Sequence, residues 1–427
     1  MKGLMKRFVS LLLAVVLILT LPQYSREVFA AKSTANLPRP ADSYTQDGML
    51  ALLKEYNPDA YHIVSTEIYD FNSDPSVWFV FSENMISNLD SAVHETFHGY
   101  AFDTAYTMGK PENIYTGNDR SYALDYRGIP LFASSEAFED LDPSLRTGRF
   151  ETYVGKSSTT SANTNGVYGL LNEFSACYWG LNTMSSLMDY YKEYDTDNTC
   201  WKAYVTSLAN NMNAYAEFKY WILSYILYAK DNHPKTYKAI IQDRGFCTAY
   251  TIMNEQFTTL INDNLAAHNT INDYLSDRNC AIVASDGIYF YEGNTFSGKD
   301  LHDFITLMKE MNSDSRYSDI SKIIEKKAIN SSKGKPSKPI WSTIKRESDG
   351  IMLQWRENSD AKGYYIYRST NDGAYKLVKK IKNASKTTWI DPDATDTGST
   401  YKYKLKAYTR KKNKIVKSEF SSVLSSN

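Results

Sequence analysis

Helical spacing dominates the first three quarters of the chain. Apolar residues recur at intervals of three and four along four segments, a pattern typical of helices with one buried face. These segments are residues 82–105, 167–191, 201–229 and 250–275. We therefore expect residues 31–330 to be mostly helical.

Shorter patterns in the same part of the chain predict a small sheet. The β-rich runs at 61–64 and 77–81 flank a turn-like Asn-Ser-Asp-Pro at 72–75, so we expect strands between 61 and 82. The run at 288–291 is a later strand candidate. The expected fold class of this part is α+β.

The last ninety residues change period. Alternating apolar and polar residues, separated by turn formers, predict short strands that pack as an all-β sandwich. These strands are 351–355, 363–368, 375–378, 387–390 and 401–408. A polar segment rich in Ser, Lys, Gly and Pro at 330–339 is typical of a linker, and it separates this part from the helical one.

Residues 336–427 resemble a fibronectin type III domain over their whole length. The resemblance is carried by Trp355 on an early strand, by the strand Tyr365-Ile366-Tyr367, and by Gly398-Ser-Thr-Tyr401 leading into an alternating strand. It implies a spacer or binding module and supplies no chemistry by itself.

The N-terminus has the pattern of a secretory signal. Lys2, Lys6 and Arg7 precede an apolar run at 8–21, and Val28-Phe29-Ala30 offers a small-x-small cleavage site. We expect residues 1–30 to be a signal peptide and the mature protein to be secreted or extracellular, with attachment to a cell wall as a further option. An uncleaved anchor helix is the alternative, and no later segment is apolar for long enough to span a bilayer.

Charge divides the chain at the predicted linker. Residues 31–330 hold 23 Lys and Arg against 39 Asp and Glu, whereas residues 331–427 hold 21 against 9. Such an asymmetry indicates two units with different surroundings. The basic unit suits an anionic cell-surface polymer as a partner, or serves solubility alone. We expect no nucleic-acid partner.

The sequence contains none of the common short motifs for a cysteine-bound metal, a bound nucleotide or a serine nucleophile. The four cysteines, Cys177, Cys200, Cys247 and Cys280, form no C-x-x-C pair, so they do not indicate a metal knuckle. Export would permit disulfides, and three pairings remain open alongside free thiols. The sequence contains no P-loop and no G-x-S-x-G elbow.

One short motif does carry chemistry. His94-Glu95-Thr96-Phe97-His98 is an H-E-x-x-H sequence inside a predicted helix. Residues four apart share a helix face, so both imidazoles can reach one metal ion. Glu95 can then lie beside the open metal position, where it would exchange protons with an activated water. Two histidines on a solvated surface are the structural alternative.

A catalytic zinc needs a third protein ligand, and Glu173 is our candidate. It is the carboxylate of an apolar stretch, Leu170–Cys177, where an unpartnered charge would be costly. A structural ion pair is the alternative role. Four other histidines remain as alternative third ligands, namely His62, His233, His268 and His302. The longer metzincin pattern fails because positions 101 and 104 are Ala and Thr.

Asn172-Glu173-x-x-Ala176 following H-E-x-x-H resembles the gluzincin metallopeptidases. The resemblance implies a zincin-like catalytic domain at residues 31–335, with zinc held by His94, His98 and Glu173 and with Glu95 as general base and acid. Two features depart from the family: 75 positions separate His98 from Glu173, and Cys177 stands where some members have an acidic residue.

These observations predict a secreted zinc metallopeptidase that acts on a peptide or protein substrate. Two other classes remain as alternatives. One is a non-catalytic secreted binding or adhesion protein, which an intact Glu95 disfavours. The other is an accessory of a cell-wall glycan hydrolase, whose chemistry normally needs a pair of carboxylates instead of an H-E-x-x-H motif.

Overall fold

The computed structural model describes residues 37–80 and 84–328, and residues 336–426 with gaps at 337–338, 340, 356–357, 359–360, 372, 412–413, 419 and 422. The predicted signal peptide at 1–30 and most of the predicted linker lie outside these ranges. The described chain is mixed α+β, with a helical region at 38–328 and a β region at 341–426, so the coarse prediction of fold class is confirmed.

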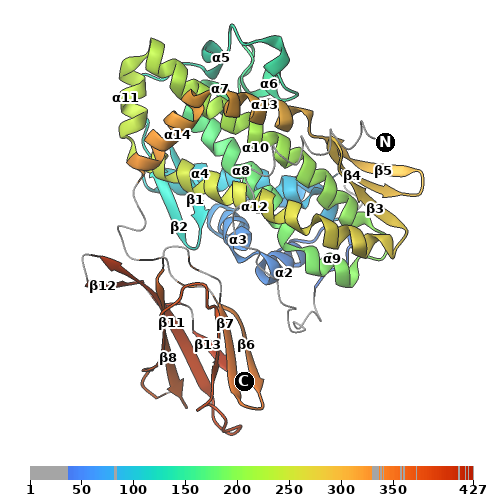
Figure 1. Cartoon of the computed structure of the whole chain (residues 1–427), viewed down its shortest axis with the longest axis vertical. Helices are drawn as coiled ribbons and strands as arrows, with labels where there is room; N and C mark the ends of the chain where they lie inside the picture. Colours follow the sequence, from blue (N-terminus) through green and yellow to red (C-terminus); the bar gives the residue numbers. More distant parts are fainter. Residues whose placement is uncertain are drawn as a thin grey trace. The chain divides into compact units, whose positions relative to one another are not determined.

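Six longer helices form the main part of the helical region (Figure 1). They are α2 (Gln46–Tyr56), α3 (Pro58–Phe71), α4 (Leu89–Thr107), α8 (Val167–Ser186), α10 (Thr199–Asn232) and α12 (Arg244–Ser276). Shorter helices complete it: η1 (Pro75–Phe79), η2 (Ile86–Asn88), α5 (Ser134–Ala137), η3 (Pro143–Leu145), α6 (Phe150–Tyr153), α7 (Ser161–Thr164), α9 (Met188–Tyr194), α11 (Pro234–Gln242), α13 (His302–Ser313) and α14 (Ser315–Lys327). The four predicted helical segments are all present.

Helix α8 is the centre of this region. It packs against both α4 and α10, and nearly all of its side chains are buried. A helix that is apolar on every side is stable only when other elements surround it. Glu173 is the single charged residue of α8 and is only 6% exposed, so the fold places one carboxylate inside a hydrophobic core.

Small residues let α8 approach its neighbours closely. A Cβ at Gly180 would lie 3.1 Å from the Asp90 carbonyl oxygen of α4, and one at Gly169 would lie 2.0 Å from the Ser161 carbonyl oxygen of α7. Both contacts are shorter than ordinary van der Waals contact. The missing side chain at Gly180 thus allows α8 to lie against the helix that carries His94 and His98.

The prediction of strands between 61 and 82 is wrong. Residues 58–71 form α3, and residues 75–79 form the short helix η1. The Asn57 side chain accepts a hydrogen bond from the Ala60 N–H at 3.1 Å, and Pro58 occupies the first helical position. Both are helix-start signals that outweigh the β-branched composition of the segment.

Two small antiparallel sheets accompany the helices. A hairpin of β1 (Glu112–Gly117) and β2 (Arg120–Leu124), which the sequence analysis did not predict, turns at Asn118 and Asp119 with φ of 57° and 56°. Positive φ at both positions is what a tight two-residue hairpin needs. The second sheet has β4 (Gly287–Glu292) between β3 (Cys280–Val283) and β5 (Thr295–Asp300), which confirms the strand predicted at 288–291.

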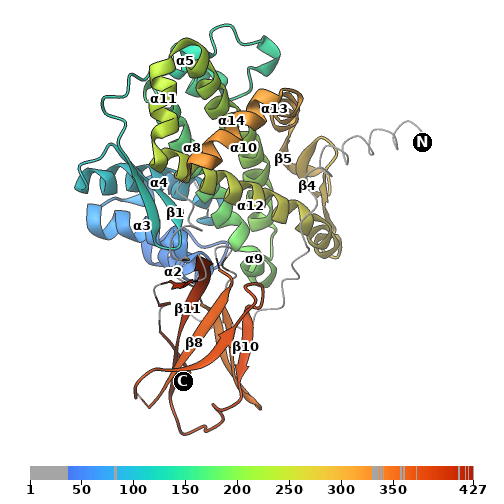
Figure 2. The ribbon, with the colours of Figure 1, turned by 60° about the vertical axis from the view of Figure 1, so that its left-hand side comes forward.

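The β region forms two antiparallel sheets around its own hydrophobic core. One sheet has the order β10-β7-β6, and the other has the order β12-β11-β8-β9, with β13 also paired to β11. Figure 2 shows β8 and β11 side by side. The strands of the β region are β6 (Trp341–Glu347), β7 (Gly350–Trp355), β8 (Gly363–Thr370), β9 (Lys376–Ile381), β10 (Thr388–Asp391), β11 (Tyr401–Lys411), β12 (Lys414–Lys417) and β13 (Leu424–Ser426). All five predicted strands are present, and β6, β12 and β13 are additional.

The four cysteines are buried free thiols. The structure therefore contains none of the disulfides that the sequence left open. Across the described ranges, no helix is both long enough and apolar enough to cross a bilayer.

Candidate metal centre

The two histidines of the H-E-x-x-H motif point from α4 toward α8. Their side chains are each 18% exposed, and their rings lie edge to face with centroids 4.8 Å apart. Val93 and Phe97, which alternate with them along the helix, are fully buried and fix the orientation of this face. The spacing of four residues thus places both imidazoles on one side of α4, as predicted.

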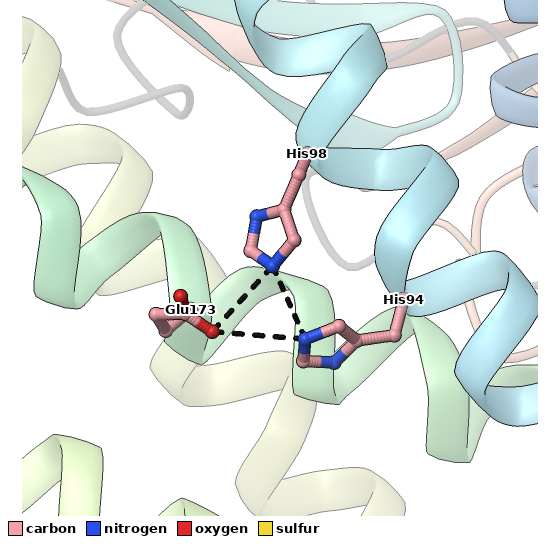
Figure 3. A group of neighbouring side chains, drawn as sticks. All are labelled: His94, His98 and Glu173. Atoms are coloured by element: carbon pink, nitrogen blue, oxygen red, sulfur yellow. Dashed lines mark hydrogen bonds and ion pairs between the residues drawn. The ribbon is translucent and has the colours of Figure 1, made fainter. Parts of the chain in front are cut away.

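Glu173 completes a triangle with these histidines (Figure 3). The His98 Nε2 atom lies 3.1 Å from the His94 Nε2 atom, and Glu173 Oε2 lies 3.5 Å from His98 Nε2 and 3.6 Å from His94 Nε2. Within the described ranges, His94, His98 and Glu173 are the group of His, Cys, Asp or Glu side chains whose ligand atoms converge closely enough to hold a metal ion.

The dimensions of this triangle suit a tetrahedral ion. With ligand distances of about 2.0–2.1 Å, two ligands of a tetrahedral zinc are separated by about 3.3 Å. The three observed separations, 3.1, 3.5 and 3.6 Å, bracket that value. Two imidazoles and one carboxylate are also a donor set that catalytic zinc uses, with a fourth position left open. The residues therefore fit a metal ion, and the identity of the metal belongs to the proposal below.

Asn172 orients His98. The His98 Nδ1 atom forms a short hydrogen bond with the Asn172 Oδ1 atom. A carbonyl oxygen can only accept, so His98 carries a proton on Nδ1 and, when neutral, presents the bare lone pair of Nε2 to the centre of the triangle. Such a partner on the far nitrogen is the usual way in which a protein fixes the tautomer of a metal-binding histidine.

The electrostatics of the triangle demand a cation. Burial opposes ionisation of Glu173, but hydrogen bonds and attraction from His94 and His98 outweigh it and lower its pKa to about 2. Burial likewise opposes a charge on His98, yet the interaction with Glu173 outweighs it and raises the pKa of the imidazole. A carboxylate and two imidazole nitrogens at this separation repel one another unless a proton or a metal ion lies between them.

A second buried carboxyl group, that of Glu112, lies close to Asn172. Glu112 on β1 is 1% exposed, and burial raises its pKa to about 8, although Asn172 and His98 act in the opposite direction. Both Glu112 oxygens and the Asn172 Nδ2 atom lack a hydrogen bond at ordinary distance among the described residues. Glu112 is therefore mostly a neutral acid at pH 7, and it lies close enough to His98 and Glu173 for their charges to affect its pKa.

Glu95 and Tyr153 lie close to the triangle. Glu95 is half-buried and close enough to His98 for its charge to raise the pKa of that imidazole. Tyr153, at the end of α6, is half-buried, and burial and then the charge of Glu173 raise the pKa of its phenol, with a smaller contribution from Glu95. Burial also raises the pKa of Cys177, so this thiol stays neutral.

The other histidines do not join the triangle. His62 lies 3.2 Å from the Tyr100 hydroxyl, and His233 lies 2.7 Å from the Glu136 carboxylate. His302 is exposed at the start of α13, and the Nε2 atom of His268 is buried without a hydrogen-bond partner. None of these alternative third ligands is part of the converging group.

The structure thus brings together the three predicted metal ligands and places Glu95 beside them. Sequence reasoning gave no role to Glu112 or Tyr153, and it used Asn172 only as part of a motif. The sole signal for Asn172 was its place directly before Glu173 on an apolar helix. Comparison of the chain with protein-family models, with curated proteins and with solved structures finds no match in any of the three.

Proposed function

We propose that this protein is a zinc metallopeptidase that hydrolyses peptide bonds of a protein or peptide substrate. The observation that carries the proposal is the convergence of His94 Nε2, His98 Nε2 and Glu173 Oε2 on one point, with separations of 3.1–3.6 Å, next to an intact Glu95. Zinc fits this donor set, and a secreted protein with the signal pattern at residues 1–30 would meet it outside the cell.

Glu95 would act as general base and then as general acid. It follows His94 directly on α4, is only half-buried and is close enough to His98 to affect its pKa, so its carboxylate could meet a water bound in the triangle. When bound, zinc would polarise the scissile carbonyl and lower the pKa of a water toward about 7. Glu95 would accept a proton from that water and donate it to the leaving amine.

Tyr153 is our candidate for the group that stabilises the developing oxyanion. Peptide hydrolysis places negative charge on the carbonyl oxygen, and a fixed O–H donor lowers the energy of that state. The Tyr153 phenol stays protonated, because burial and the nearby carboxylates raise its pKa. It is therefore available as a donor near Glu173 and Glu95.

The β region would be a fibronectin type III module. Its sheet order supports this proposal, since strands β6, β7 and β10 form one sheet and β8, β9, β11, β12 and β13 the other. The short strands β12 and β13 both pair with β11, so together they would take the place of the single last strand of a seven-stranded sandwich. Trp355 is 1% exposed and lies in the core between the sheets. This module carries none of the residues assigned to hydrolysis.

Metal content and peptide cleavage, measured together, test the proposal. Wild type, Glu95→Gln, Glu173→Ala and Tyr153→Phe are purified, with Glu193→Gln on the exposed face of α9 as a control for removal of one carboxylate. We expect one zinc per chain in all except Glu173→Ala. Cleavage of a mixed peptide library should fall by at least about a thousandfold in Glu95→Gln and by about a hundredfold in Tyr153→Phe.

The same experiment separates the alternatives. Wild-type protein that holds zinc but cleaves no peptide would be a binding or adhesion protein. Cleavage of glycan that survives a zinc chelator would indicate a glycan hydrolase with paired carboxylates. Zinc retained in Glu173→Ala would show that a residue other than Glu173 is the third ligand.

A further inference from the structure

One face of the larger sheet in the β region is covered by lysines. Tyr403, Leu405 and Ala407 of β11 point into the core, so the alternating Lys404 and Lys406 lie on the opposite, outer face. Lys380 of β9 and Lys417 of β12 extend the row to both sides. We call Lys380, Lys404, Lys406 and Lys417 the lysine face.

Strand register brings aromatic residues onto the same face. Tyr365 of β8 pairs with both Lys406 and Lys380, and Tyr408 of β11 pairs with Lys417. Directly paired residues project to one side of a sheet. The lysine face and these rings therefore form one continuous outer surface.

The rings hold the ammonium groups in place. Nζ of Lys417 lies 4.4 Å from the Tyr365 ring centre, and Nζ of Lys380 lies 5.1 Å from it. Nζ of Lys404 and of Lys406 lie 4.0 Å and 4.1 Å from the Phe420 ring centre. Each ammonium thus has a cation–π partner, an interaction that orders a charge without neutralising it.

Among the described residues, no carboxylate forms an ion pair with this surface. The ion pairs of the β region among its described residues join Lys345 to Glu347 and Arg368 to Asp391, and neither involves the lysine face. Lys380 and Lys417 are exposed, and Lys404 and Lys406 are half-buried. Four positive charges on neighbouring strands therefore remain available to an external anion.

We propose that the lysine face binds a linear polymer that carries a phosphodiester group in each repeat and no stacking base. Residues two apart on a strand are separated by about 6.7 Å, and adjacent strands by about 4.8 Å. The interval along the strand, which separates Lys404 from Lys406, is comparable with the P–O–C–C–C–O–P repeat of an extended glycerol phosphate chain, and Lys380 lies on the far side of β8. The four lysines belong to β9, β11 and β12, so such a chain can contact them by running across the sheet.

The side chains on the face favour phosphate over carboxylate and over nucleic acid. The planar fork of arginine binds both carboxylate and phosphate bidentately, whereas lysine binds phosphate as a point charge, and the four cations of this face are all lysines without that fork. Single-stranded nucleic acid needs open aromatic rings on which its bases stack. Tyr365 and Tyr408 are only 6% and 4% exposed. The half-buried Phe420 ring is already in contact with the ammonium groups of Lys404 and Lys406, so the face offers no open ring for stacking.

Binding of the full chain to fluorescent poly(glycerol phosphate) tests this proposal. Release of about 0.7 counterions per contact predicts a slope of log K against log salt of about −3 for four contacts. At about 0.1 M salt each contact contributes roughly fivefold, so Lys404→Gln/Lys406→Gln should bind roughly 25-fold more weakly, with a slope of about −1.4. The control is Lys382→Gln/Lys386→Gln, which removes the same charge from exposed positions beyond β9.

The control variant should bind like the wild type, and near-UV circular dichroism should show both variants folded. Equal loss of binding in the two double variants would overturn the proposal, since net charge alone would then account for it. Wild-type protein that ignores the polymer at 50 mM salt would also overturn it. Tighter binding of oligo(dT) or of polygalacturonate would replace the phosphodiester polymer with a nucleic acid or a carboxylated glycan as the partner. Zinc content and peptide cleavage are read separately, so the outcome is independent of the proposed hydrolysis.

Discussion

Asn172 decides which nitrogen of His98 faces the metal position. Its Oδ1 atom accepts a hydrogen bond from the Nδ1–H group of His98 and so directs the lone pair of Nε2 toward His94 and Glu173. Asn172 is fully buried, so water cannot replace it as a partner for that proton. A residue of this kind acts through the ligand that it positions.

Removing the Asn172 amide should weaken zinc binding without removing any ligand. We expect Asn172→Leu to raise the zinc dissociation constant about 10- to 100-fold, because the Nδ1 proton loses its acceptor. Asn172→Asp keeps an acceptor and should retain tight binding. Competition with a chromophoric chelator measures the affinity, and Asn182→Leu on the same helix is the control. Unchanged affinity in Asn172→Leu would mean that packing alone orients His98.

The pKa of Glu112 has a consequence for stability. In the folded protein this carboxyl keeps its proton up to a pH of about 8, whereas in the unfolded chain it releases it near 4.5. The unfolded state therefore binds fewer protons than the folded state between these values, and this group lowers stability progressively as pH rises through that window. Below about pH 4.5 both states are protonated and the effect vanishes.

Glu112→Gln should remove this pH dependence. The amide has the same shape and no charge, so metal-free Glu112→Gln should match the metal-free wild type near pH 5 and exceed its free energy of unfolding by up to a few kcal/mol at pH 8. Urea unfolding midpoints at the two pH values give the comparison. A variant whose stability changes with pH as steeply as that of the wild type would show that Glu112 ionises freely in the fold.

Local sequence patterns predicted most helices and strands and the three metal ligands, whereas long-range packing determined which other residues lie beside those ligands. The histidine pair is local, since residues four apart share a face of α4 whatever surrounds it. Glu173 could be inferred because one charge in an apolar helix needs a partner. Glu112 could not, because its role depends on how β1 packs against α4 and so brings this side chain to Asn172, which no spacing in the sequence encodes.

The mistaken strands at 61–82 show which signal was misjudged. Ile63 and Val64 favour strands by composition, yet they recur with Ala60, Glu67 and Ile68 at helical spacing on the buried face of α3. In the β region, alternation and turn residues gave the right strands because each strand has a core face and an outer face, but the pairings of β10 with β7 and of β11 with β8 join strands that are not consecutive and could not be read from local turns. The hairpin β1–β2 was missed although Asn118-Asp119 is a short turn between two β-forming runs.

Close helix packing at Gly169 is a further testable feature of α8. Alanine usually stabilises a helix interior by about 0.5–1 kcal/mol relative to glycine. Here the new Cβ would meet the Ser161 carbonyl oxygen at 2.0 Å, and backbone cannot move aside as a flexible side chain can. We expect Gly169→Ala to lower the free energy of unfolding by about 1–3 kcal/mol. Gly180→Ala, with its nearest contact at 3.1 Å, should cost less.

Thermal or urea unfolding of both glycine variants checks this order. If Gly169→Ala were more stable than the wild type, α7 would have to yield to the methyl group, and the close approach would not constrain α8. Zinc affinity measured on the same samples shows whether a shift of α8 also displaces Glu173.

At the scale of the whole molecule, each of the two hydrophobic cores belongs to a stretch of the chain with its own excess of charge. One core gathers buried residues between Met49 and Ile324, and the other gathers buried residues between Ile351 and Ala407, with no shared member. The excess of acidic residues belongs to the first stretch and the excess of lysine and arginine to the second. Chemistry and polymer binding are thus assigned to parts with separate sources of stability.

Separate cores should unfold separately, and zinc should stabilise only one of them. A region with its own core can form its own cooperative unit, so calorimetry of the full chain should resolve two transitions. Zinc in hundredfold excess over its dissociation constant adds about 2.7 kcal/mol to the state that binds it. The transition of the helical region should therefore rise by several degrees, and that of the β region should stay in place.

In Glu173→Ala the rise should disappear, whereas Lys404→Gln/Lys406→Gln should keep it. A single transition that zinc moves as a whole would show that the two cores are coupled, and loss of the carboxylate ligand would then also lower the stability of the lysine face.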